Sequence, residues 1–112
     1  MLAASAILGV LVVIWHAPLV FLGMLPAYAL FGTFAFTIVF DWLYNKVKGS
    51  VLMTLMAHAA DGLVLTGYLN LNAADSERHI MLLVGVWIVA AAVVVLFNGS
   101  MRSLKPAPLA QP

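Results

Sequence analysis

Long apolar stretches alternate with short polar ones along the chain, and this pattern predicts four helices. Residues 2–22 and 26–40 contain no Asp, Glu, Lys or Arg, and apolar residues also dominate 51–71 and 80–97. A helix needs about 20 apolar residues to cross the hydrocarbon core of a bilayer. We therefore expect four membrane-spanning helices in these stretches.

Turn and capping residues mark the expected ends of the helices. Pro18 lacks a backbone N–H, so the first helix is expected to kink or end there. Ser50 follows a short basic turn and suits the N-cap of the third helix. Residues 70–76 are expected to form a loop. The domain organisation expected is a transmembrane domain at 1–100 followed by a disordered, proline-containing tail at 101–112.

The composition indicates an integral membrane protein. The 112 residues are 65% hydrophobic and 8% charged, whereas soluble domains carry about 25% charged residues. The formal net charge of +1 argues against a nucleic-acid partner, and the lack of cysteine excludes disulfides and thiolate metal sites. The expected fold class is all-α, a multi-pass helix bundle with about four transmembrane helices and the lipid bilayer as its partner.

The positions of the basic residues predict the orientation in the membrane. Lys46 and Lys48 follow the second apolar stretch, while Arg102 and Lys105 follow the fourth. With four spans these two segments lie on the same side, and positive residues collect on the cytoplasmic side. We therefore expect both chain ends to be cytoplasmic.

His16, His58 and Asp61 are polar residues inside apolar spans, where such residues are costly and often functional. The first and third spans run in the same direction, so His16 and His58 can face each other in the bundle interior. Two neutral imidazoles there could bind a divalent metal or hold an oxyanion. Asp61, about one helical turn from His58, could orient that ring. The alternatives are structural: a helix-end histidine at His16 and an interhelical hydrogen bond at His58.

The other polar and aromatic residues have simpler interpretations. Asp41 lies next to Trp42 and is expected at the membrane interface, where Trp and Tyr side chains are enriched. Gly62 and Gly67 are expected to be close-packing positions. The fourth span, 80–97, is expected only to pack against the other helices or to face lipid.

Two segments resemble motifs of a known family. Residues 15–23 (WHAPLVFLG) look like the second motif of the CPBP intramembrane metalloproteases, the CAAX-processing and bacteriocin self-immunity enzymes also called the Abi family. Residues 42–59, which include the basic turn and His58, resemble the approach to that family's third motif. The resemblance covers residues 2–65, and the fourth span is compatible with it.

The resemblance assigns roles to individual residues. His16 matches the histidine of the family's F-x-x-x-H motif, with Val12 at the phenylalanine position. His58 matches the histidine of H-x-x-x-N, with Gly62 at the asparagine position and Asp61 just before it. The implied activity is that of an endopeptidase with the two histidines as catalytic residues and metal ligands, and Asp61 as a further catalytic candidate. The implied cofactor is a divalent metal such as zinc, and the implied substrate is a membrane-associated or prenylated peptide at a bacterial plasma membrane.

The largest departure from the family is the missing E-E-x-x-x-R motif. In the family this motif lies on the helix before F-x-x-x-H, and its glutamate is implied to activate the attacking water as general base. The one glutamate of this chain, Glu77, falls in an expected loop region. We therefore expect the C-terminal part of such a protease, truncated or inactive alone. The alternative is a small non-enzymatic multi-pass membrane protein whose interior histidines serve packing or proton and metal handling.

Overall fold

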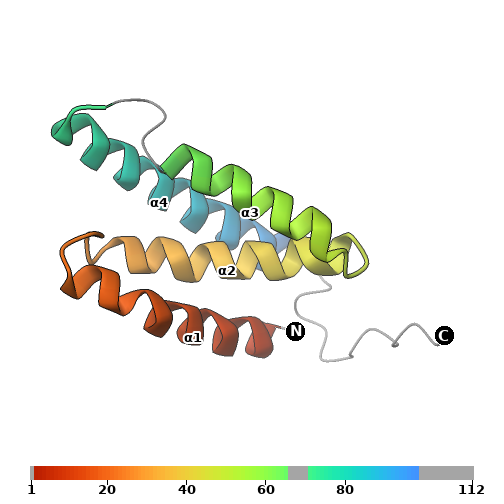
Figure 1. The fold of residues 1–112 in the computed structure, drawn as a ribbon. Helices are drawn as coiled ribbons and strands as arrows, with labels where there is room; N and C mark the ends of the chain where they lie inside the picture. The colour runs from red at the N-terminus through yellow and green to blue at the C-terminus, as the bar shows by residue number, and fades with distance from the viewer. Residues whose placement is uncertain (1, 66–70, 99–112) are drawn as a thin grey trace.

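The computed structural model describes residues 2–65 and 71–98, which form four α-helices. These are α1 (Leu2–Phe21), α2 (Ala29–Lys46), α3 (Val51–Leu65) and α4 (Ala73–Phe97). Successive helices run in opposite directions, so α1 and α3 point the same way (Figure 1). The expected all-α fold is confirmed for this part of the chain, while the tail expected at 101–112 lies outside the described residues.

The first two helix boundaries follow from turn residues. α1 continues past Pro18 and ends at Phe21, shortly before Gly23 takes a positive φ of 70°. The turn after α2 contains Lys48 and Gly49 with φ angles of 55° and 79°. A positive φ is uncommon for a residue with a side chain, so Lys48 is held there by the tight reversal of the chain.

Side-chain caps determine the starts of α3 and α4. The Ser50 hydroxyl accepts the Met53 N–H at 3.4 Å, so the expected N-cap of α3 is confirmed. The loop expected at 70–76 is wrong at its end, because α4 already begins at Ala73. The reason is Asn72, whose side-chain oxygen accepts the N–H of Asp75 at 2.9 Å and satisfies an otherwise free donor of the first turn.

α2 is the central helix, and it packs against α1, α3 and α4. The buried core between α2 and α4 consists of Ala35, Ile38, Ala91 and Val94. The two backbones approach closely at Gly32, where an added Cβ would lie 2.8 Å from Cγ2 of Val84. Packing through small residues is typical of helix pairs in membranes.

The outer surface of the bundle is strongly apolar. Among the large exposed side chains are Trp15 and Phe21 on α1 and Phe97 on α4, each more than four-fifths accessible at 81%, 88% and 82%. Two of the described helices, α1 and α4, are long and apolar enough to cross a membrane. α3 contains a shorter apolar stretch, Val51–Asp61.

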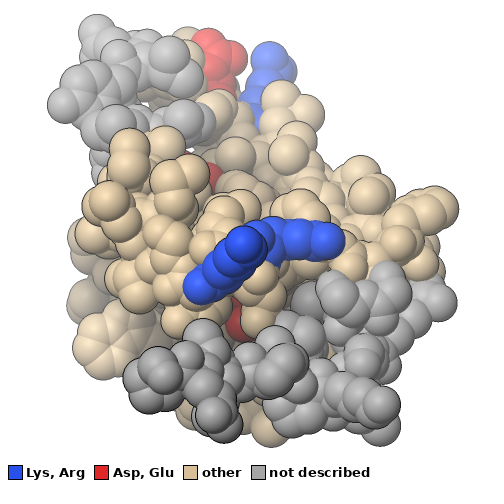
Figure 2. Space-filling view, turned by 90° about the vertical axis from the view of Figure 1, so that its right-hand side faces the viewer, with Lys and Arg blue, Asp and Glu red and all other residues tan. Residues whose placement is uncertain are grey.

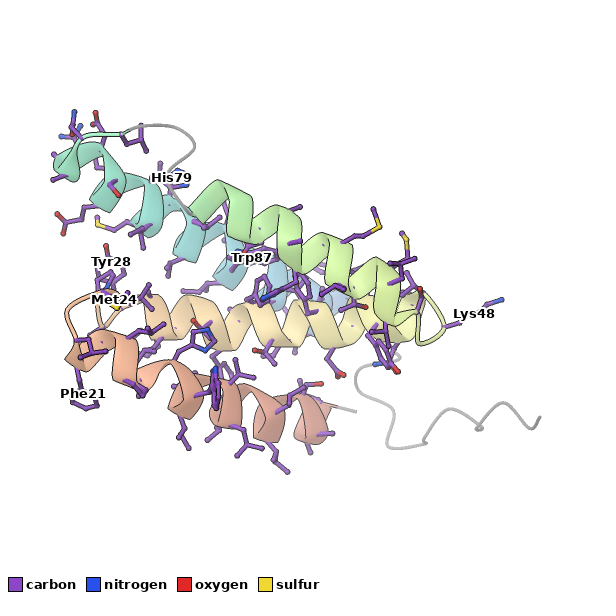
Figure 3. The ribbon with its side chains drawn as sticks, viewed as in Figure 1. Phe21, Met24, Tyr28, Lys48, His79 and Trp87 are labelled. Atoms are coloured by element: carbon purple, nitrogen blue, oxygen red, sulfur yellow. The ribbon has the colours of Figure 1, made fainter. Side chains whose placement is uncertain are left out.

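The two ends of the bundle carry different loops. The start of α1, the α2–α3 turn with Lys48, and the end of α4 lie together at one end (Figures 1 and 3). Met24 and Tyr28 in the α1–α2 connection lie at the other end, near the start of α4 (Figure 3). Basic side chains extend across the first end (Figure 2), and the basic residues of its turn region are Lys46 and Lys48.

Candidate functional site

A cavity of about 700 Å³ lies between the helices and is bordered by all four of them. This volume is within the usual range of small-molecule sites. Its polar lining residues are His16, Thr33, Thr37, Asp41, Tyr44, Thr54, His58, Asp61 and Trp87. The three site residues predicted from the sequence therefore border one cavity together with polar groups from α2 and α4.

α2 contributes a polar stripe to the cavity. Thr33, Thr37 and Asp41 follow one another at four-residue spacing, which returns to nearly the same face of a helix. The Thr33 hydroxyl donates to the Ala29 carbonyl at 3.1 Å, and the Thr37 hydroxyl donates to the Thr33 carbonyl at 2.9 Å. Both hydroxyl protons are therefore satisfied within the helix, which leaves their oxygens as acceptors.

His16 enters the site from α1 in a defined tautomer. Its Nδ1 lies 2.8 Å from the backbone oxygen of Val12. A carbonyl oxygen can only accept, so Nδ1 carries a proton and donates it to this bond. In the neutral ring Nε2 then holds the lone pair, and it can accept a proton or serve as a ligand.

His58 belongs to an aromatic cluster formed with Phe36, Phe40 and Trp87. Its ring centroid lies 5.4 Å from that of Phe36 and 6.0 Å from that of Phe40, in edge-to-face arrangements. Phe36 and Phe40 stack at 3.9 Å, and Trp87 lies 4.8 Å from Phe36. The His58 side chain is exposed rather than enclosed as expected, because this cluster covers only part of its ring.

Asp61 is tied to α4 by Trp87. The indole Nε1–H donates to Oδ1 of Asp61 at 3.2 Å, and Trp87 lies at the middle of the bundle (Figure 3). The fourth span was expected to do no more than pack or face lipid, and that interpretation missed this contact. No pattern along the sequence indicates it, since the two partners lie on different helices.

Asp41 is likewise joined to another helix. The hydroxyl of Ser5 on α1 donates to Oδ2 of Asp41 on α2, and Ser5 is completely buried at 0% exposure. The interfacial interpretation of Asp41 did not anticipate this bond or its place on the cavity wall. The four-residue spacing of Thr33, Thr37 and Asp41 is the signal that could have revealed the place of Asp41 on the cavity wall.

The described residues do not form a metal centre. Within residues 2–65 and 71–98, no three His, Asp or Glu side chains gather closely enough to hold one metal ion. Zinc sites use three or four protein ligands. His16 and His58 border one cavity with Asp41 and Asp61, but among the described residues no three of these side chains lie close enough together to hold one ion. These residues therefore do not fit a tightly held divalent metal, and no chemical step is derived through one.

Glu77 lies away from the cavity. It lies on α4 rather than in a loop and is not part of the cavity wall. Its backbone oxygen accepts a hydrogen bond from the Tyr28 hydroxyl at 3.5 Å, which links the starts of α2 and α4. The acids that border the cavity are Asp41 and Asp61.

Comparisons with known protein families, with curated proteins and with solved structures give no match to this chain. A functional assignment therefore depends on the cavity and on the two sequence motifs that resemble a family.

Proposed function

We propose that all four helices span a membrane. α1 and α4 have the necessary length and hydropathy, and the outward faces of the other two are also apolar. Phe31 on α2 is 70% exposed, and Leu52 and Leu55 on α3 are 66% and 60% exposed. A continuous apolar surface of this kind is costly in water and is covered by acyl chains in a bilayer.

The proposed orientation in the membrane is based on the basic residues at one end of the bundle. The end with Lys46 and Lys48 also holds the start of α1 and the end of α4. Cytoplasmic segments are enriched in lysine and arginine. The proposal is therefore a plasma-membrane protein with both chain ends in the cytoplasm.

The proposed activity is intramembrane peptide hydrolysis of the CPBP type, with this chain as the C-terminal part of the catalytic core. The observation that carries the proposal is that His16 and His58, the residues matching the family's two motif histidines, border one cavity. The tautomer of His16 also supports the proposed activity, because its Nε2 is available to accept a proton or bind an electrophile. The substrate class implied by the resemblance is a membrane-associated or prenylated peptide.

The described residues offer an incomplete catalytic set. Asp61 borders the cavity and is the acid nearest in sequence to the histidine motif, but it is already an acceptor for Trp87. Loss of a general base typically costs about 10²–10⁴ in rate. We therefore expect no measurable turnover by the 112-residue chain.

The experiment is turnover of a prenylated CAAX peptide by the purified chain in lipid nanodiscs. The 112-residue chain is compared with a version extended by any in-frame upstream segment that encodes E-E-x-x-x-R. We expect turnover in the extended chain alone, abolished by His16→Ala and by His58→Ala. Trp15→Phe, on the exposed face, is the matched control and should retain activity.

Two results would contradict this proposal. Turnover that survives both histidine changes would return His16 and His58 to a packing role. Turnover by the 112-residue chain that Asp61→Asn abolishes would make Asp61 the general base.

A second candidate is a non-enzymatic membrane protein that uses the cavity for binding. The observation that favours it is that both cavity acids already accept hydrogen bonds, Asp41 from Ser5 and Asp61 from Trp87. Such bonds stabilise helix pairs without any chemistry. Absence of turnover in the extended chain would support this candidate.

A further inference from the structure

The charged groups on the cavity wall are acidic. Asp41 and Asp61 border the cavity, and its described lining includes no lysine or arginine. The basic side chains in the described ranges lie elsewhere: Lys46 and Lys48 near the α2–α3 turn, and Arg78 beside Asp75 at 3.8 Å. Two carboxylates thus face the cavity, and the basic side chains on its wall are the imidazoles of His16 and His58.

The side chains that donate hydrogen bonds to these carboxylates are neutral. Ser5 and Trp87 each donate one hydrogen bond, whereas an ionised carboxylate can accept about four. The part of the chain that the structure describes gives neither acid an ion pair within 4.0 Å. A carboxylate in apolar surroundings is costly unless a positive charge compensates it. The geometry therefore favours a cation in the cavity.

The aromatic cluster lies beside one of the acids. Phe36, Phe40 and Trp87 all border the cavity, and Trp87 is bonded directly to Asp61. The ring centroids of Phe40 and Trp87 are 5.9 Å apart. The faces of aromatic rings attract cations, and quaternary ammonium groups are recognised in this way.

The shape of the cavity argues for an organic cation rather than a metal ion. No described group of three ligating side chains could hold a metal. The volume of about 700 Å³ is far larger than an ion requires. Most of the remaining wall is aliphatic and includes Leu8, Leu19, Leu25, Ile80 and Leu83. This wall matches the apolar body of a ligand whose charged group lies at Asp61.

We propose that the cavity binds an organic cation with an apolar body, such as an alkyl or aryl ammonium. Its charged group lies between Asp61 and the rings of Phe36, Phe40 and Trp87. The proposal depends on the charge and shape of the cavity, and it holds whether or not a peptide is hydrolysed there.

The test compares a cation with its neutral isostere. Benzyltrimethylammonium and neopentylbenzene have the same shape and differ in charge. Equilibrium dialysis is performed with the 112-residue chain in nanodiscs of zwitterionic lipid, with empty nanodiscs as the blank for partition. We expect saturable binding of the ammonium and only unsaturable partition of the hydrocarbon.

Substitutions then locate the site. Asp61→Asn should weaken binding of the ammonium by about tenfold or more, since the opposite charge is lost in an apolar site. Phe36→Leu should weaken it several-fold through loss of a ring face. Asp75→Asn is the matched acidic control, because Asp75 is exposed and lies outside the cavity, and it should leave the affinity unchanged.

Two outcomes would overturn the inference. One is equal saturable binding of both probes to the wild-type chain, a comparison that needs no substitution. The other is unchanged ammonium affinity in a folded Asp61→Asn/Asp41→Asn chain, with helicity checked by circular dichroism. Neither outcome bears on peptide hydrolysis, which is judged by the His16 and His58 variants of the extended chain. Conversely, failure of hydrolysis leaves the ammonium measurement unaffected.

Discussion

The indole Nε1 of Trp87 donates a hydrogen bond of 3.2 Å to Oδ1 of Asp61 and thereby joins α4 to α3. Within the described residues, α3 packs less extensively on α2 than α1 and α4 do. A polar bond to α4 therefore contributes a larger share of the attachment of α3 than it would for another helix. The same bond fixes the position of one cavity acid.

Replacing Trp87 with Phe keeps an aromatic ring at the site but removes the N–H donor. We expect the free energy of unfolding to fall by about 1–2 kcal/mol, because Asp61 loses its hydrogen bond. The measurement is denaturant titration of the chain in mixed micelles. Trp15→Phe is the control, since Trp15 is 81% exposed and should change stability by less than about 0.5 kcal/mol. Equal losses in the two variants would show that the bond contributes nothing.

Ser5→Ala is expected to destabilise the α1–α2 pair. Ser5 is fully buried, and its loss leaves the Asp41 carboxylate without the donated hydrogen bond. The cost should be about 1–3 kcal/mol, the penalty for an unsatisfied polar group. Combining it with Asp41→Leu should recover much of this loss, because removing both partners removes the penalty. A double variant that is less stable than Ser5→Ala would contradict the explanation.

Gly32 and Gly85 allow a matched test of the packing between α2 and α4. A Cβ on Gly32 would lie 2.8 Å from Cγ2 of Val84 and 3.3 Å from its Cα, while a Cβ on Gly85 would meet no atom within 4 Å. Gly32→Ala should therefore lower stability by about 1–3 kcal/mol through overpacking. Gly85→Ala should be neutral or stabilising by up to about 1 kcal/mol through helix propensity. Thermal unfolding of both variants checks this, and similar melting temperatures would rule out the close approach of α2 and α4.

The lack of cysteine in the chain allows a direct test of orientation. Lys48→Cys and Met24→Cys each place a single thiol at an exposed residue, at opposite ends of the bundle (Figure 3). In intact cells an impermeant maleimide should label Met24→Cys, whereas Lys48→Cys should react only after the cells are lysed. Labelling of Lys48→Cys in intact cells would reverse the proposed orientation.

The sequence was sufficient to predict the helices because their apolar stretches are long and clearly bounded. The prediction from the sequence placed the start of α4 too late, although Asn72 and Asp75 have the spacing of a side-chain cap. The common location of His16 and His58 was predictable in outline, since helices separated by one span run in the same direction. Their cavity proved more open at His58 than the sequence suggested.

The partners of the two cavity acids were beyond the reach of the sequence. Ser5 and Trp87 lie on α1 and α4, which are apolar around most of their circumference. An amphipathic helix shows from its pattern which side faces the core, but a helix of this kind shows no preferred side. Its rotation about its own axis is decided by contacts such as those at Gly9 with Phe34 and at Gly32 with Val84.

The close approach of α2 and α4 at Gly32 also determines which parts of the bundle could separate. α2 shares the buried core with α4 and packs almost as extensively on α1, whereas α3 is the least extensively packed of the described helices. Outward displacement of α3 requires the Trp87–Asp61 bond and the contacts of His58 with Phe36 and Phe40 to break, but it leaves the packing of α2 with α1 and α4 intact. In the membrane location proposed above, such a movement would let a hydrophobic molecule enter the cavity sideways from among the acyl chains, without passing through either aqueous face.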